Sequence, residues 1–311
     1  MTAKDLKDCH KRIKSNIHRT PVMTSRLLNT MSGADLFFKC ENFQRMGAFK
    51  MRGAMNAILQ LSDQQKSKGV VTHSSGNFAQ ALSLAAQNLG ITAYIVMPSN
   101  APKVKKEAVK GYGGHIIECP PTQKDRESTA IRVQLEKGAT YIHPSNQLEV
   151  ILGQGTAALE LLEDYPDLEY IFAPVGGGGL IAGTALAAYF YGKNCTIIGG
   201  EPFEVDDAYR ALKSGKLEMN ETTHTIADGL RMPLGDVNFP IIKKYVSEII
   251  RVEEKEIIDA MQLIWERMKI IIEPSCAVPF AALLRKKERF KNKKIGIILS
   301  GGNVDLSNLP F

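Results

Sequence analysis

One lysine of the chain lies in a setting that favours covalent chemistry. Lys50 stands between Phe49 and Met51 in the stretch ENFQRMGAFKMRG, residues 41–53. Apolar neighbours keep water from an ammonium group, which lowers its pKa and favours the neutral, nucleophilic amine. Such an amine forms a Schiff base with the aldehyde of a carbonyl cofactor. The alternative on this stretch alone is a surface lysine at the start of a helix predicted over residues 51–61.

Four consecutive glycines follow a predicted strand. Residues 170–174 read as a strand, and Gly176–Gly179 come directly before a helix predicted over residues 180–190. Glycines let the backbone wrap closely around a phosphate, and a helix N-terminus favours an anion there. The spacing fits neither the P-loop nor the dinucleotide fingerprint. A phosphate loop is therefore favoured over a plain tight turn.

Small polar residues gather at two other predicted strand ends. The segment THSSGN (72–77) precedes a helix, where several N–H groups could hold a carboxylate. An ordinary helix cap would explain one serine or asparagine of that segment. The segment SGGN (300–303) puts Ser300 where its hydroxyl could meet a ring nitrogen. An amine, a phosphate loop and a partner for a pyridine nitrogen together fit pyridoxal 5'-phosphate.

Three carboxylates follow another predicted strand within seven residues. Glu201, Asp206 and Asp207 supply hard oxygen ligands of the kind that magnesium and calcium prefer. A solvated acidic turn explains the same residues. Their types and spacing leave both interpretations open.

The elements that must position these residues alternate along the chain. Strands separated by helices of 10 to 15 residues indicate parallel βαβ units with right-handed crossovers. The predicted fold class is α/β with two doubly wound, mostly parallel sheets and an active site in the cleft at their carboxyl ends. Residues 69–146 are expected to close as a small domain, and residues 1–68 and 147–311 as a large cofactor-binding domain. Residues 201–247 read as irregular.

The composition is that of an ordinary globular chain. Of 311 residues, 44% are hydrophobic and 23% charged, and the net charge is +6. The basic clusters lack interleaved aromatic residues, so no nucleic-acid partner is expected. The five cysteines are scattered without a CxxC pair, which disfavours a disulfide framework and a zinc site. Without an apolar leader or a long apolar run, we expect a cytoplasmic protein that does not enter a membrane.

Taken together, the motifs resemble the serine racemase and serine/threonine dehydratase family. These are fold-type II pyridoxal-phosphate enzymes with the tryptophan synthase beta-like fold. The resemblance runs nearly from end to end. It is carried by FFKCENFQRMGAFKMRGA (37–54), THSSGN (72–77), GQGT (153–156), PVGGGG (174–179), IADG (226–229) and LSGGNVD (299–305).

The resemblance implies a role for each candidate residue. Lys50 would bind the cofactor covalently, Asn77 would bond its phenolic oxygen, and Ser300 would meet its pyridine nitrogen. A neutral hydroxyl at that nitrogen suits elimination and racemisation. The phosphate would be held by Gly176, Gly177, Gly178, Gly179 and Leu180. The substrate would contact Ser74, Ser75, Asn77 and Phe78.

Ser75 bears on the choice between racemase and dehydratase. The family's racemases and hydroxyaspartate dehydratases carry serine at this position, whereas typical threonine dehydratases carry alanine. A racemase needs acid–base groups on both faces of the substrate, because one group returns the proton to the side it left. Lys50 and Ser75 would supply the two groups. The alternative role for Ser75 is a helix cap.

Two departures and two further implications accompany the resemblance. Phe78 stands where the family usually has histidine, and Ser145–Leu148 differ from the usual segment after His-Pro. Both departures concern substrate or cofactor contacts. The resemblance also implies a divalent cation, magnesium or calcium, on Glu201, the carbonyl of Val205 and Asp207, and a homodimer.

We therefore expect an enzyme that acts on a small amino acid. It would deprotonate L-serine or L-threonine at Cα and then either reprotonate it or eliminate water, giving a 2-oxo acid and ammonia. A hydroxyaspartate dehydratase of the same family is the alternative within that class. A non-catalytic ligand-binding protein is the alternative from another class, and the retained Lys50 argues against it.

Overall fold

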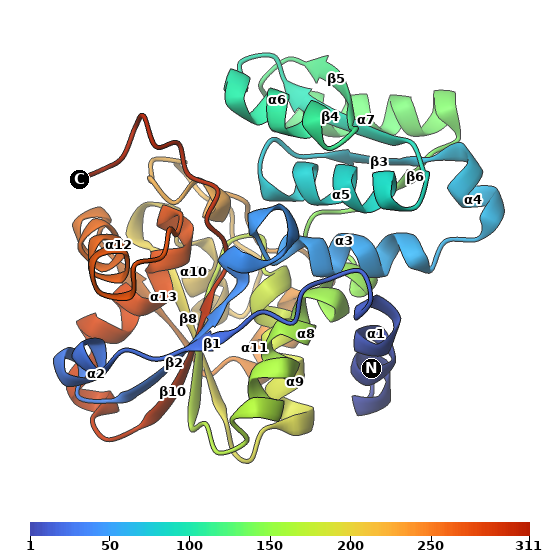
Figure 1. Ribbon diagram of the computed structural model, residues 1–311. Helices are drawn as coiled ribbons and strands as arrows, with labels where there is room; N and C mark the ends of the chain where they lie inside the picture. Colours follow the sequence, from blue (N-terminus) through green and yellow to red (C-terminus); the bar gives the residue numbers. More distant parts are fainter.

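Two separate sheets organise the molecule, and the computed structural model describes every residue from 1 to 311 (Figure 1). The larger sheet has six strands in the order β1-β2-β10-β7-β8-β9. All its pairs are parallel except that between β1 and β2. Its strands are β1 (Val22–Met23), β2 (Asp35–Cys40), β7 (Tyr170–Pro174), β8 (Thr196–Pro202), β9 (Glu248–Val252) and β10 (Lys294–Leu299).

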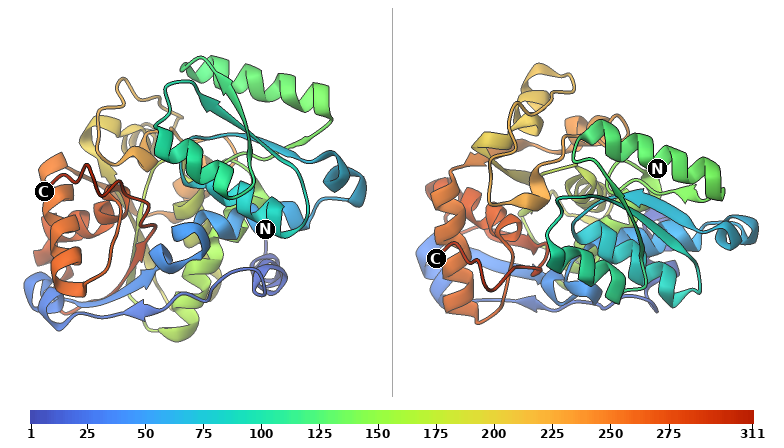
Figure 2. Two further views of the ribbon diagram at one scale, coloured as in Figure 1. Left: turned by 45° about the horizontal axis from the view of Figure 1, so that its top comes forward. Right: turned by 90° about the horizontal axis from the view of Figure 1, so that it is seen from above.

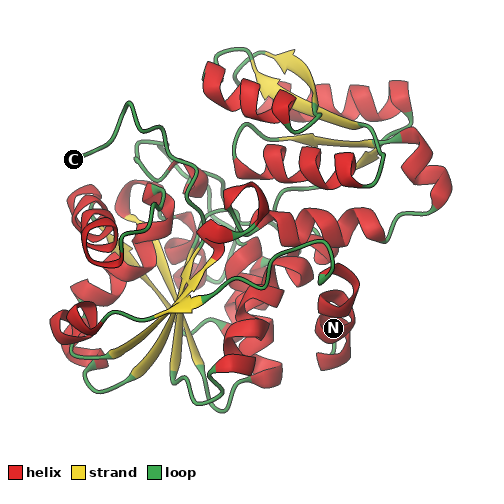
Figure 3. Ribbon diagram, viewed as in Figure 1, coloured by secondary structure: helices red, strands yellow, loops and turns green.

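Helices cover both faces of this sheet, as Figure 3 shows. Strands buried on two faces read as continuous apolar runs, and the stretch KIGIIL of β10 is buried after its first residue. Two large hydrophobic clusters fill the two faces. One face carries α2 (Arg26–Ser32), α12 (Glu254–Met268) and α13 (Pro274–Arg285). The other carries α1 (Ala3–Ile13), α8 (Leu148–Asp164), α9 (Gly179–Tyr191), α10 (Asp207–Ser214) and α11 (Phe239–Tyr245).

The smaller sheet is parallel throughout, in the order β5-β4-β3-β6. The views of Figure 2 show α7 along its outer side, away from the larger sheet, and α7 contacts all four strands. On its other side α5 packs against both the sheet and α3 (Lys50–Leu59). The elements of this unit are β3 (Val70–His73), α5 (Asn77–Asn88), β4 (Ala93–Pro98), α6 (Lys103–Gly111), β5 (His115–Cys119), α7 (Gln123–Lys137) and β6 (Thr140–Tyr141).

Helix α3 lies between the two sheets and packs on α8 through backbone contact. A Cβ atom added at Gly153 would lie 2.5 Å from the carbonyl oxygen of Arg52, and one at Gly53 would lie 2.8 Å from that of Val150. Since no real Cβ makes contacts this short, both positions require glycine. Helix α8 also meets α9 at Gly155, where an added Cβ would lie 2.6 Å from the oxygen of Gly183.

The predicted fold class is confirmed, and three local predictions need correction. The sequence predicts a helix over residues 155–164, but α8 already begins at Leu148, because its two glycines permit close helix packing and do not end the helix. The segment 201–247, predicted as irregular, contains α10 and α11. The strand β9 that follows it was not predicted either; it pairs with β8 at the margin of the sheet, and α10 and α13 pack on it.

Candidate active site

Lys50 is the first residue of α3 and stands among apolar rings and a single carbonyl. Its Nζ donates a hydrogen bond to the oxygen of Pro144 at 2.9 Å. The same nitrogen lies 5.0 Å from the ring centre of Phe49 and 5.7 Å from that of Phe78. Exclusion of water lowers the pKa of Lys50 to about 8, although the negative charge of Glu273 acts to raise it. The amine is therefore much closer to neutrality than an exposed lysine.

The glycine loop lies between β7 and α9 with its backbone donors free. The N–H groups of Gly176, Gly177 and Gly178 donate to no atom of the protein, and Gly179 and Leu180 add first-turn donors of α9. Gly178 has a φ of +77°, and an added Cβ would lie 2.6 Å from Leu234. These free donors at a helix N-terminus form an anion cradle.

A second row of free donors follows β3, at the start of α5. The cap residue of α5 is Gly76, and no side chain makes a capping hydrogen bond. Ser75 is half-buried and its hydroxyl is therefore free of the capping role that the sequence left open. The backbone N–H groups of Ser75, Asn77 and Phe78 also lack an acceptor, which suits the carboxylate of an amino acid.

Ser300 brings the end of β10 to the Lys50 segment. Its carbonyl accepts the N–H of Phe49 at 3.0 Å, and Gly301 pairs with Ala48 in an isolated bridge. The Ser300 side chain is buried, and its hydroxyl makes no hydrogen bond within the protein. Because β10 lies between β2 and β7, the lysine segment, Ser300 and the glycine loop share one edge of the larger sheet.

Two residues at this edge, Glu273 and Asn303, were given no role in the sequence analysis, although Asn303 belongs to the SGGN segment. Glu273 accepts from Asn77 Nδ2 with both oxygens, at 2.9 and 3.0 Å, and Asn303 Nδ2 donates to Asn77 Oδ1 at 2.9 Å. Burial raises the pKa of Glu273 to about 7. The only sequence signal was a lone carboxylate in the apolar run around IIIEPSCAV, residues 270–278.

The residues that depart from the family pattern border the glycine loop. His143 Nδ1 accepts the N–H groups of Ser145 and Asn146 at 3.1 and 2.7 Å, so this nitrogen is unprotonated. Burial lowers the pKa of His143 to about 4, which keeps it so. An added Cβ on Gly177 would lie 2.5 Å from the Ser145 hydroxyl. The turn that carries the acceptor of Lys50 therefore also touches the anion cradle.

The acidic segment after β8 separates into two environments. Asp206 pairs with Arg210 and Arg251, both at 2.7 Å, as a partly exposed acidic group. Glu201 and Asp207 are fully buried and make no salt bridge. Burial, and next the charge of Asp207, raise the pKa of Glu201 well above its usual value. Burial raises the pKa of Asp207 to about 6.

These two carboxylates accept protein hydrogen bonds but form no salt bridge, and among cations only the more distant charge of Arg210 acts to lower the pKa of Asp207. Glu201 accepts the N–H groups of Ala208 and Tyr209 at 3.0 and 2.8 Å, and Asp207 accepts that of Leu234 at 3.0 Å. Val205 is buried in the 3-10 turn between them. The structure holds no group of three or more His, Cys, Asp or Glu side chains that could bind a metal. A cation here would depend on backbone oxygen as well.

The chain matches the family described as "Pyridoxal-phosphate dependent enzyme" over residues 13–301. It belongs to that family. A beta-hydroxyaspartate dehydratase from Paracoccus denitrificans is 49% identical, over 100% of this chain and 98% of its own. The crystal structure of serine racemase from Dictyostelium discoideum has a TM-score of 0.94 at 49% identity, covering 98% and 99% of the two chains. That of a threonine deaminase from T.th. has a TM-score of 0.94 at 40% identity, covering 99% and 100%.

The residues of this pyridoxal-phosphate-dependent enzyme fit the cofactor of its family. The free N–H groups of the glycine loop match a phosphate, and the hydrogen-bond-free hydroxyl of Ser300 matches a ring nitrogen. Lys50 is the amine nearest to neutrality at the same edge. No helix of the enzyme combines the length and apolar character needed to cross a bilayer.

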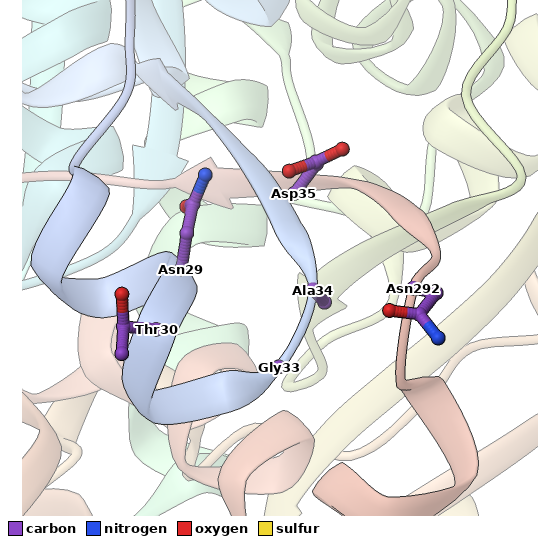
Figure 4. A pocket seen from close by; sticks show the side chains of 6 residues that line it. All are labelled: Asn29, Thr30, Gly33, Ala34, Asp35 and Asn292. Atoms are coloured by element: carbon purple, nitrogen blue, oxygen red, sulfur yellow. The ribbon is translucent and has the colours of Figure 1, made fainter.

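A polar hollow elsewhere on the larger unit has no share in this chemistry (Figure 4). It lies between α2, the start of β2 and the turn before β10, at the opposite edge of the sheet from Ser300. Asn29 already accepts the N–H of Leu36 at 3.1 Å, and the N–H of Asn292 closes the turn onto Gly33 at 2.7 Å. Its lining residues are Asn29, Thr30, Gly33, Ala34, Asp35 and Asn292.

Proposed function

We propose that this enzyme removes the α-proton of L-serine or a close relative and either returns it to the other face or expels the β-hydroxyl. The first outcome is racemisation, and the second yields a 2-oxo acid and ammonia. The bound cofactor supplies the electron sink that makes the α-proton acidic. The observation that carries the proposal is the lowered pKa of Lys50 beside two rows of free backbone donors.

Within this proposal Lys50 and Ser75 divide the proton transfers between them. Lys50 holds the cofactor and, when free, takes or gives a proton on its own face. Ser75 offers a hydroxyl that caps no helix, and it would serve the other face. The free N–H groups of Ser75, Asn77 and Phe78 would hold the substrate carboxylate, with Ser74 completing the loop.

The cofactor would be held at three further points. Gly176–Gly179 and Leu180 would bind its phosphate through backbone N–H groups. Asn77 would donate to its phenolic oxygen, and Ser300 would meet its pyridine nitrogen. A hydroxyl at that nitrogen carries no charge, which suits reactions that need only modest stabilisation of the carbanion.

A hydroxyaspartate is the second candidate substrate. The dehydratase from Paracoccus denitrificans and the serine racemase from Dictyostelium discoideum are equally similar to this chain, at 49% identity. The substrates in these two names differ by one carboxylate on the β-carbon. A comparison of the turnover rates with serine and with the 3-hydroxyaspartates would therefore identify the preferred substrate.

Three further proposals concern the protein around the site. Glu201, the Val205 carbonyl and Asp207 would bind magnesium or calcium, which would offset the repulsion between two buried carboxylates. Residues 69–146 would form a small domain against a large one made of 1–68 and 147–311. The working form would be a cytoplasmic homodimer.

The decisive experiment begins with the absorbance of the purified protein. Pyridoxal phosphate attached to Lys50 should give an absorbance band near the visible range, and borohydride reduction should remove that band. After reduction and digestion, the cofactor should be recovered on the peptide that contains residue 50. The loaded protein is then offered L-serine, D-serine, L-threonine and the 3-hydroxyaspartates, and 2-oxo acid and enantiomer are measured. Absence of the band, or of turnover with every substrate, would contradict the proposal.

A further inference from the structure

Three chain segments meet on the carboxylate of Glu273, which stands one residue before α13. The backbone N–H of Glu273 donates to the oxygen of Gly301 at 3.0 Å, which binds it to the end of β10. An added Cβ on Gly301 would lie 3.0 Å from Glu273 Oε1, so the carboxylate packs closely against this glycine. The backbone N–H of Asn303 donates to Glu273 Oε2 at 3.2 Å. Asn77 Nδ2 supplies the remaining hydrogen bonds.

This arrangement determines which way the Asn77 amide points. An ionised carboxylate only accepts hydrogen bonds, so the nitrogen of Asn77 must face Glu273. The oxygen of Asn77 accepts from Asn303 Nδ2 at 2.9 Å. Both oxygens of Glu273 lie within reach of Asn77 Nδ2, and one hydrogen shared between them would leave the other for a ligand. The rotated amide would present an oxygen to Glu273 and lose both contacts.

The same network holds the turn before Lys50. Asn303 Nδ2 also donates to the oxygen of Met46 at 2.8 Å, and Met46 has a φ of +55°, in the left-handed region that non-glycine residues seldom adopt. An added Cβ on Gly47 would lie 2.7 Å from Asn303 Oδ1. A change at Glu273 therefore reaches both Asn77 and the segment that carries the lysine.

The charges around Glu273 make it responsive to ligand and pH. Asp228 and Lys105, which pair with each other, and Lys50 face it from other elements, and Cys276 faces it from α13. No cation forms a salt bridge with it. Burial raises its pKa to about 7, so it changes charge near neutrality. A protonated Glu273 loses one acceptor and no longer determines the orientation of Asn77.

We infer that Glu273 is a positioning residue, which turns the Asn77 amide nitrogen towards the phenolic oxygen of the cofactor and places a negative charge near the Lys50 nitrogen. This inference rests on the proposed function, because Asn77 and Lys50 matter only if the cofactor binds there. It extends that function by naming a group that touches neither substrate nor cofactor and still sets the electronic state of the bound cofactor.

The test compares Glu273→Gln and Glu273→Asp with the unaltered enzyme, all loaded with pyridoxal phosphate. Glutamine replaces an accepting oxygen with a donor, whereas aspartate keeps the charge on a shorter stem. In the glutamine variant we expect roughly tenfold weaker binding of pyridoxal phosphate, because a charged hydrogen bond is lost. The apparent pKa of the absorbance change on pH titration should fall by about one unit, because a negative charge near a cationic nitrogen is removed. The aspartate variant should lie between the two.

Matched controls separate positioning from simple folding. Glu254→Gln removes a carboxylate acceptor of the Ile226 N–H, outside the site, and should leave cofactor affinity and titration unchanged. If Glu273→Gln does not fold, Asn303→Ser removes the amide that donates to Asn77 Oδ1. It should weaken the binding of pyridoxal phosphate in the same way, and it should leave the titration near that of the unaltered enzyme, because the Glu273 charge remains. Unchanged affinity and titration with only a lower melting temperature would overturn the inference. An unaltered enzyme that shows no borohydride-sensitive band would instead overturn the proposed function, which keeps the two failures distinct.

Discussion

Two groups of buried or half-buried charges in this enzyme differ in whether an opposite charge pairs with them. Behind α3, the side chain of Arg52 makes paired hydrogen bonds to Glu41 and Glu160 at 2.7 to 2.9 Å, and Lys39 donates to Glu160 at 2.7 Å. All four side chains are fully buried. Each charge there faces an opposite one. At the sheet edge, Lys50, Glu273, Glu201 and Asp207 have no salt bridge.

The pKa values follow this difference. Burial raises the pKa of Glu160, but hydrogen bonds from His10 and Arg52 and the Arg52 charge lower it overall. Lys50, Glu273 and Asp207 instead shift towards neutrality, because burial is not compensated. Charges that are paired with opposite charges need no further partner, whereas charges without such a partner are suited to binding a ligand. The contrast therefore separates structural charge from functional charge.

Among changes to the two groups of charges, removal of the Lys50 amine should have the largest effect on activity. Lys50→Ala should reduce both racemisation and elimination by about 10⁴-fold, because the variant loses its proton-transfer group and covalent anchor. The measurement is D-serine and pyruvate formation at saturating pyridoxal phosphate. Lys103→Ala, an exposed lysine on α6, is the control and should retain full activity. Substantial turnover by the Lys50→Ala variant would assign the chemistry to another group.

Breaking the compensated cluster should act on stability rather than on chemistry. Arg52→Met leaves Glu41 and Glu160 without their main partner and should lower the free energy of unfolding by about 3 to 5 kcal/mol. Urea denaturation monitored by circular dichroism measures this. Lys4→Met, which removes an exposed pair with Asp8, should leave the midpoint unchanged. A neutral result for Arg52→Met would mean that the cluster is not structural.

Ser75→Ala should separate the two reactions of the site. We expect racemisation to fall by roughly 10²-fold or more while elimination from L-serine changes little, because only the second face loses its proton group. D-serine and pyruvate are measured in the same reaction mixture. Ser74→Ala provides the comparison for a general disturbance of the loop. An equal fall in both products would show that Ser75 only shapes the loop.

Addition of magnesium or calcium should raise the melting temperature by about 5 °C at a hundredfold excess over the dissociation constant. The cation would bind the native state through Glu201 and Asp207 and remove their repulsion. EDTA should reverse the shift, and Asp207→Asn should abolish it while the borohydride-sensitive band remains. Glu204→Gln, on the exposed side of the same turn, should respond as the unaltered enzyme does. A cation-independent melting temperature would leave the two carboxylates as a buried pair without a metal.

The smallest effect is expected at the aromatic contact of the lysine. Phe78→His replaces an apolar ring 5.7 Å from Lys50 Nζ with a polar one and should raise the pKa of Lys50 by less than about one unit. Phe78→Leu keeps the site apolar and should leave that pKa near its present value of about 8. The pH dependence of amine modification in the cofactor-free enzyme measures both. A larger shift in the leucine variant would mean that ring electrons, and not exclusion of water, set the value.

Local signals made much of this site predictable. The glycines at 176–179 and Ser300 directly follow strands, Lys50 lies in the segment after β2, and parallel strands bring their ends to one edge. Glu273 could not be found in that way, because its partners Asn77 and Asn303 are 196 and 30 residues away along the chain. Spacing shows neighbours in sequence and not contacts of this kind.

The acidic segment and the glycines of α8 also could not be fully interpreted from the sequence. Asp206 and Asp207 are adjacent, and only the fold turns one towards two arginines and the other into the interior. Gly153 and Gly155 resemble helix breakers until the neighbouring helices are known. In both cases the residue type was read correctly, and the surroundings that give it meaning come from tertiary packing.

Those glycine contacts have a mechanical consequence. Helix α8 touches the backbone of α3 at Gly153 and that of α9 at Gly155, and the three helices have no side-chain layer between them at these points. Lys50 is at the start of α3, and the anion cradle is at the start of α9. Both therefore belong to helices that pack directly on the backbone of α8. The distance between the Lys50 amine and the anion cradle is thus determined by the backbone contacts of these three helices. The loop that carries Ser75 follows β3 of the smaller sheet, so its position relative to the amine is set by other contacts, those of α5 with α3 and of Asn77 with Glu273 and Asn303.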